Sequence, residues 1–147
     1  MYKHILIPSD GTELSDKAIE AGVEFARESK AKVTGFTAVP EYQVPTEDEM
    51  MARRGVSLAQ YEQDARLKAQ RTLQRIIDRA RAAGVEYEAD YALSDRPYEA
   101  IIRAAQKHRC DLIFMASHGR RGISALIHGS QTRDVLTHST IPTLVYR

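Results

Sequence analysis

Short apolar runs alternate with longer segments of helical periodicity along this chain, and this alternation constrains its fold more than any other feature. Runs of about four to eight apolar residues bounded by turn residues predict strands, whereas apolar residues three or four apart predict amphipathic helices. The expected strands cover residues 4–7, 32–39, 85–93, 111–116 and 141–146. Strands that alternate with helices in this way predict an α/β domain with a mostly parallel sheet.

The character of each strand predicts its place in the sheet. Residues 4–7 and 111–116 are almost continuously apolar, which is typical of central strands covered on both faces. Residues 85–93 alternate, and Pro142 removes a hydrogen-bond donor from the last strand, so both strands fit edges. With right-handed crossovers the strand order becomes 3-2-1-4-5. We therefore expect one domain over residues 1–147, a doubly wound, Rossmann-like α/β fold with helices on both faces of the sheet.

Helix boundaries follow from residues that favour helix ends. The expected caps and stops are, in chain order, Thr12 or Ser15, Gly84, and Ser94 or Asp95. The apolar positions of the longest helix run from Leu58 to Ala80, and the last helix is expected over residues 132–137.

Residues 40–56 show no clean period and contain two prolines and an acidic run. They predict a long loop with at most one helical turn. A loop of this length in a compact domain is either a functional lid or a tolerated surface insertion, and the sequence leaves both interpretations open.

The composition excludes several functional classes. The formal net charge is +1, so no basic field indicates nucleic acid. No apolar run approaches the roughly 20 residues that span a bilayer, and the opening residues predict structure rather than a signal peptide, so we expect a cytoplasmic protein. The single cysteine, Cys110, is expected to be a structural thiol. Histidines at positions 108, 118, 128 and 138 match neither the helical nor the strand period, so we expect no metal site from the protein alone.

The loop after the fourth expected strand carries the strongest functional signal. In doubly wound sheets ligands bind beyond the carboxyl ends of the strands, at the point where the strand order reverses. Asp10 and the loop that contains Gly119 both reach that point. Glycine allows close approach to the backbone, and a helix that begins near Gly129 favours a negative charge at its N-terminus. The sequence therefore predicts a phosphate-binding site, although it has neither a P-loop lysine nor a dinucleotide fingerprint.

Several side chains near this point have the chemistry that a nucleotide requires. Ser130 and Thr132 supply hydroxyl donors, and Arg120 can pair with outer phosphates. Asp10 can accept from a ribose hydroxyl or help to hold Mg²⁺, or it can instead cap the first helix or satisfy loop amides. The end of the second strand, Ala38 and Val39, predicts a small apolar wall for a base.

The spacing of the loop resembles that of the universal stress protein family. The motif of that family reads Gly-x-x-Gly, nine residues, then Gly-Ser/Thr, and Ala116-Ser117-His118-Gly119 with Gly129-Ser130 match its spacing. The opening Pro8-Ser9-Asp10 and the ending Ile141-Pro142-Thr143-Leu144-Val145 are also similar to that family. The resemblance covers nearly the whole chain.

The resemblance implies a homodimeric protein whose nucleotide-binding members hold ATP at the carboxyl edge of the sheet. With Asp10 as a candidate ligand, we expect Mg²⁺ to accompany the ATP. The residues that match the family's binding segments, together with two further loop residues, His118 and Arg120, are Pro8, Ser9, Asp10, Ala38, Val39, Met115, Ala116, His118, Gly119, Arg120, Gly129, Ser130, Gln131 and Thr132. The sequence departs from the family where Ala116 replaces the first motif glycine. It also departs at His128 and Gln131, whose positions are usually apolar in the family.

Three hypotheses follow for function. The first is an ATP-binding regulatory homodimer, paired through the exposed edge strand from Ile141 to Tyr146 and read by a regulatory protein partner. The second is a dimeric interaction protein whose cleft cannot bind nucleotide because of Ala116 and the polar substitutions at His128 and Gln131. The third is a slow ATPase or phosphoryl transferase. Phosphoryl transfer needs a positioned nucleophile and base, which the sequence does not indicate, so we expect a protein that is not an enzyme.

Overall fold

The computed structural model describes residues 1–117 and 131–147 of the chain. Within these residues, five parallel strands form one sheet in the order β3-β2-β1-β4-β5. The strands are β1 (His4–Pro8), β2 (Lys32–Val39), β3 (Tyr87–Leu93), β4 (Leu112–Ala116) and β5 (Thr143–Tyr146). The predicted order and both predicted edges are confirmed.

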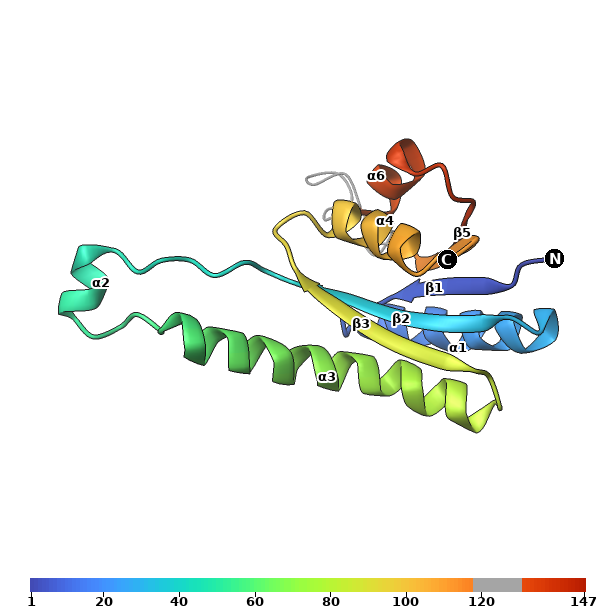
Figure 1. Cartoon of the computed structure of the whole chain (residues 1–147), viewed down its shortest axis with the longest axis horizontal. Helices are drawn as coiled ribbons and strands as arrows, with labels where there is room; N and C mark the ends of the chain where they lie inside the picture. The colour runs from blue at the N-terminus through green and yellow to red at the C-terminus, as the bar shows by residue number, and fades with distance from the viewer. Residues whose placement is uncertain (118–130) are drawn as a thin grey trace.

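Helices cover the two faces of this sheet (Figure 1). The helices α1 (Glu13–Ser29) and α3 (Leu58–Ala82) lie on one face, and α4 (Pro97–Lys107) and α6 (Gln131–His138) lie on the other. No helix among the described residues is long and apolar enough to cross a membrane.

Alternation along the central strands divides the core between the two faces. Ile5 and Ile7 of β1 pack in the cluster formed with α1 and α3, whereas Leu6 packs in the cluster formed with α4 and α6. All three side chains have no exposed surface. A parallel strand buried on both faces needs apolar residues at every position, which is why the continuous apolar run predicts the centre of the sheet.

The helix ends show which side chains act as caps. The Thr12 hydroxyl accepts from the backbone N–H of Ser15, so the first of the two predicted α1 caps is confirmed. The prediction that Ser94 or Asp95 caps α4 is wrong. Arg96 is the N-cap and provides no side-chain capping bond, since the Ser94 hydroxyl accepts from the Arg96 N–H and Asp95 accepts from the Glu41 N–H.

The segment between β2 and α3 projects beyond the sheet together with the first turns of α3 (Figure 1). Its predicted helical turn is a five-residue helix, α2 (Glu47–Met51), closed by a capping box between Thr46 and Glu49. The Tyr61 hydroxyl donates to the Pro40 carbonyl oxygen, and the Tyr42 hydroxyl donates to that of Val56. These bonds tie both ends of the segment to each other and to α3.

Candidate functional site

A cavity of about 210 Å³ opens at the carboxyl ends of β1, β2 and β4, where the strand order reverses. Its floor consists of strand ends, and its sides come from the first turns of α1, α4 and α6. The described residues that line it are Pro8, Ser9, Asp10, Ser15, Phe36, Thr37, Ala38, Pro97, Ile101, Met115, Ala116 and Gln131. A site at the switch point of this sheet was predicted from strand order, and the cavity lies there.

Most of the predicted site residues that the structure describes line this cavity. They are Pro8, Ser9, Asp10, Ala38, Met115, Ala116 and Gln131. Val39 and Thr132 do not line it. The Val39 side chain packs against Ala65 and Ala69 of α3, and the Thr132 hydroxyl donates to the Ala116 carbonyl oxygen. Successive side chains of a strand point to opposite faces, so the Val39 side chain points to the face opposite that of Ala38.

Five further predicted residues, His118, Gly119, Arg120, Gly129 and Ser130, lie outside the described residues. Sequence reasoning also missed five residues that line the cavity, namely Ser15, Phe36, Thr37, Pro97 and Ile101. Phe36 was within reach of prediction, because it lies two positions before Ala38 on the same strand and therefore shares its face.

Asp10 organises the turn between β1 and α1. Its Oδ1 atom accepts from the Thr12 backbone N–H at 3.0 Å, from the Thr12 hydroxyl at 2.7 Å and from the Ser15 hydroxyl at 2.7 Å. Gly11 follows with φ at +83°, and its N–H donates to the Ser9 hydroxyl at 3.1 Å. Thr12, not Asp10, is the N-cap of α1, so the capping interpretation of Asp10 is wrong, and Asp10 instead satisfies a loop amide. Asp10 also lies on the cavity wall.

The start of α6 is joined to both β4 and α4. The Thr132 hydroxyl donates to the Ala116 carbonyl oxygen at 2.8 Å, and the bond is buried. Oε1 of Gln131 accepts from the Tyr98 backbone N–H at 2.8 Å. The Tyr98 ring also contacts the His138 ring at the other end of α6 in a tilted arrangement, with ring centroids 5.2 Å apart. These contacts fix the first turn of α6 against the cavity.

The helix dipoles favour an anion in this cavity. Residues at or near the starts of three helices line it, Ser15 of α1, Pro97 of α4 and Gln131 of α6. Each helix carries a partial positive charge at its N-terminus. The other walls are apolar, with Phe36, Ile101 and Met115 contributing large side chains. Such a site can take a ligand with a flat apolar part and a negatively charged part.

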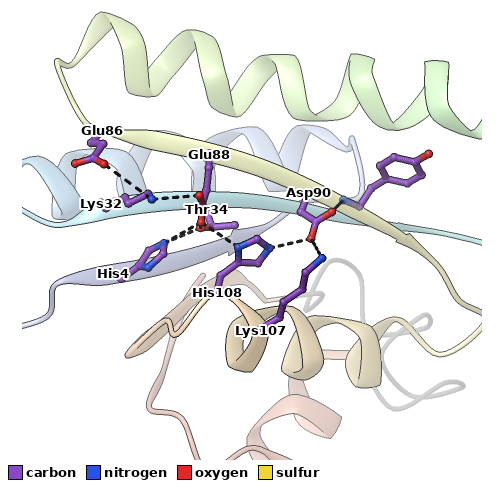
Figure 2. A network of polar contacts seen from close by, with 9 residues as sticks. His4, Lys32, Thr34, Glu86, Glu88, Asp90, Lys107 and His108 are labelled. Carbon is purple, nitrogen blue, oxygen red and sulfur yellow. Dashed lines mark hydrogen bonds and ion pairs between the residues drawn. The ribbon is translucent and has the colours of Figure 1, made fainter.

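A second polar cluster lies on the face of the sheet that α4 covers, away from the cavity (Figure 2). His108, which follows α4, lies between two carboxylates of β3, with Nδ1 3.0 Å from Oε1 of Glu88 and Nε2 2.8 Å from Oδ2 of Asp90. His4 reaches the same cluster through the Thr34 hydroxyl at 2.6 Å. His108 and His138 belong to the evenly spaced histidines noted in the sequence and lie within the described residues. Their surroundings are unrelated.

Burial and hydrogen bonding oppose each other in this cluster. Burial by itself raises the pKa of the Asp90 carboxyl, but hydrogen bonds from His108 and Lys107 outweigh it and hold the pKa below its usual value. The pKa of Glu88 is lowered in the same way, against burial, by bonds from Lys32 and Thr34. Burial lowers the pKa of His4, and Lys32 adds to that effect.

Fold and cavity together define a doubly wound α/β protein with a cavity at its switch point. The sequence model of the universal stress protein family matches residues 1–147. The universal stress protein YxiE of Bacillus subtilis is 26% identical over 163 aligned residues, which cover the whole of both chains. This chain belongs to the universal stress protein family.

Solved structures of this family share the fold. A universal stress protein in complex with cAMP matches with a TM-score of 0.77 at 24% identity, over 99% of this chain and 97% of that one. The universal stress protein from Archaeoglobus fulgidus in complex with dAMP matches with a TM-score of 0.68 at 17% identity, over 99% and 98%.

Proposed function

We propose that this protein binds an adenine nucleotide, ATP with Mg²⁺, in the cavity at the strand ends and acts as a nucleotide-responsive regulatory module. The observation that carries the proposal is the position of the cavity, which combines an apolar wall with helix N-termini at the switch point of the sheet.

The residues of the cavity walls suggest where each part of the ligand lies. The base packs among Phe36, Ile101 and Met115, since an aromatic ring needs apolar surface on its faces. The charged part lies toward the first turn of α6, where Gln131 begins the helix. Asp10 is the carboxylate on the wall that can reach a ribose hydroxyl or a magnesium ion.

The sequence extends this assignment to residues outside the described part. Gly119, Gly129 and Ser130 are proposed to supply backbone and hydroxyl donors to the phosphates, with His118 and Arg120 as further contacts. The relatives solved with cAMP and with dAMP support an adenine nucleotide as the ligand class.

Ala116 is one of the substitutions on which the alternative hypothesis depends, together with the polar residues His128 and Gln131. It replaces the first glycine of the family motif. Under the alternative hypothesis, its methyl group crowds the ligand and prevents nucleotide binding. Ala116 lines the cavity at 7% exposure, and a volume of about 210 Å³ remains beside it. This remaining space favours the hypothesis of nucleotide binding over that of a cleft that cannot bind nucleotide.

Titration calorimetry with ATP and Mg²⁺ tests the proposal. A dissociation constant below millimolar is expected, and Ala38→Phe should abolish binding because the added ring fills the cavity. Ala92→Phe is the matched control, since Ala92 pairs with Ala38 in register on the neighbouring strand and packs on the same face. Binding weaker than millimolar in the wild-type protein would favour the interaction protein with an empty cleft.

Mass spectrometry of the nucleotide released from the purified protein identifies the base. Incubation of bound ATP separates the regulatory module from a slow ATPase or transferase, because unchanged ATP after hours argues against both activities.

The homodimer belongs to the same proposal. β5 is an edge strand whose four residues are all half-buried, and an edge of this kind pairs readily with a second copy through the segment from Ile141 to Tyr146. Sedimentation equilibrium should give twice the chain mass. A monomer at all concentrations would remove the dimer, and with it the surface that we propose a regulatory protein partner reads.

A further inference from the structure

Gln131 occupies an unusual place for a glutamine, because its side chain joins two helices at the wall of the cavity. It is the first residue of α6, it lines the cavity, and Oε1 accepts from the Tyr98 N–H of α4 at 2.8 Å. The carboxamide is planar, so fixing its oxygen on Tyr98 also fixes where its nitrogen lies.

The first turn of α4 explains why that bond exists. Pro97 has no N–H, and the N–H groups of Glu99 and Ala100 both donate to the Arg96 carbonyl oxygen. Arg96 provides no side-chain cap, so the Tyr98 N–H needs an acceptor from elsewhere. Gln131 supplies it from another helix, and the N-terminus of α4 therefore has no backbone donor left for a ligand.

The Gln131 amide nitrogen remains as the donor in place of α4. No residue in the described parts of the chain accepts a hydrogen bond from its Nε2, which carries two hydrogens. The dipole of α4 polarises the carboxamide through the Tyr98 bond, and the dipole of α6 adds positive potential at the same point. A hydrocarbon side chain at this position could neither cap α4 nor donate into the cavity.

We propose that the Gln131 side-chain amide donates to the phosphate nearest the ribose of the bound nucleotide, and so selects nucleotides over nucleosides. The inference rests on the proposed function. Phe36 and Gln131 line the same cavity, so a base packed on Phe36 directs the part of the ligand next to the nucleoside toward the amide. The group beside Gln131 is therefore close to the nucleoside, and the positive potential there favours a phosphate oxygen over a neutral hydroxyl.

Gln131→Glu tests the donor separately from the cap. The glutamate retains an oxygen that accepts from the Tyr98 N–H, and its charge suits two helix N-termini, so the thermal midpoint should stay at or above that of the wild type. The amide donor becomes an anionic oxygen that repels a phosphate. We expect AMP affinity, measured by calorimetry, to fall at least about tenfold, the loss that one charge-assisted hydrogen bond represents. Affinity for adenosine, measured by ligand-observed NMR, should change less than about twofold.

Two further variants complete the experiment. Gln131→Met removes both cap and donor, so it should lower the thermal midpoint and weaken AMP about tenfold. Thr137→Glu places the same charge on an exposed position of α6 away from the cavity, and AMP affinity should remain that of the wild type.

The outcomes distinguish this inference from the proposed function. Unchanged AMP affinity in Gln131→Glu, or an equal loss for AMP and adenosine, would overturn the role of the amide while nucleotide binding stands. A wild-type protein that binds neither ligand would instead remove the proposed function and this inference with it.

Discussion

The Thr132 hydroxyl donates a buried hydrogen bond to the carbonyl oxygen of Ala116, at a distance of 2.8 Å. This bond joins the last residue of β4 to the second residue of α6, which are 16 positions apart in the chain. Since β4 ends at the cavity and α6 begins there, the bond sets the distance between the two elements that bound the predicted loop.

Thr132→Val should lower the free energy of unfolding by about 1–3 kcal/mol, because it leaves the buried Ala116 carbonyl without a partner. Thr137→Val is the matched control: its hydroxyl also donates to a backbone carbonyl at 2.8 Å, but on an exposed helix surface, and its loss should cost less than about 0.5 kcal/mol. Urea denaturation measures both. Equal effects in the two variants would mean that burial of the Thr132 bond is unimportant.

Gly35 of β2 leaves the space that Ile76 of α3 occupies. A Cβ atom on Gly35 would lie 3.0 Å from both Cδ1 and Cγ2 of Ile76 and 3.2 Å from its Cβ. We expect Gly35→Ala to destabilise the protein by about 1–3 kcal/mol, since a close-packed core resists an added methyl group.

A double variant identifies the cause of that loss. In Gly35→Ala with Ile76→Ala, the distal atoms that meet the new methyl are gone, so the two changes together should cost less than the sum of their separate effects by more than about 0.5 kcal/mol. Additive costs from chemical denaturation would place the strain elsewhere than in this contact.

The fold was largely predictable from sequence because it depends on patterns within each segment. Residues 32–39 were predicted as a strand with the observed bounds, and the apolar character of the strands gave the order of the sheet. The last strand begins two residues later than predicted, at Thr143, because the Pro142 carbonyl accepts from Ile113 while its nitrogen has no hydrogen to donate.

The site was less predictable because its details depend on contacts between distant segments. The capping of α4 by Gln131 joins residues 33 positions apart, and no local signal near Ser94 or Asp95 reveals it. The Val39 side chain packs under α3 for a simpler reason, because alternation along the strand places it on the face opposite that of Ala38.

Cys110 should be unreactive while the protein is folded. Burial raises the pKa of its thiol to about 12, so almost none of the thiolate that reacts with alkylating agents exists at pH 8. We expect iodoacetamide to leave the native protein unmodified over an hour and to modify it fully in 8 M urea, as measured by intact mass. Rapid modification of the native protein would show that the segment between α4 and β4 opens readily.

The cluster around His4 and Asp90 should make the protein less stable in acid, in two separate pH windows. A histidine whose pKa is lowered in the folded state binds its proton more readily when unfolded, so stability present above the unfolded value of about 6.5 is lost as the pH falls through the folded value. The lowered pKa of Asp90 has the same sign, but its contribution is lost near and below pH 4.

His4→Gln should therefore reduce the fall in unfolding free energy between pH 7 and pH 5, whereas Asp90→Asn should reduce only the fall below about pH 4.5. The comparison is made by urea denaturation at each pH, with His138→Gln as the control for removing a histidine outside the cluster. If His4→Gln steepens the loss between pH 7 and pH 5, the ring is favoured in its charged form in the folded protein, and burial is not the dominant influence on it.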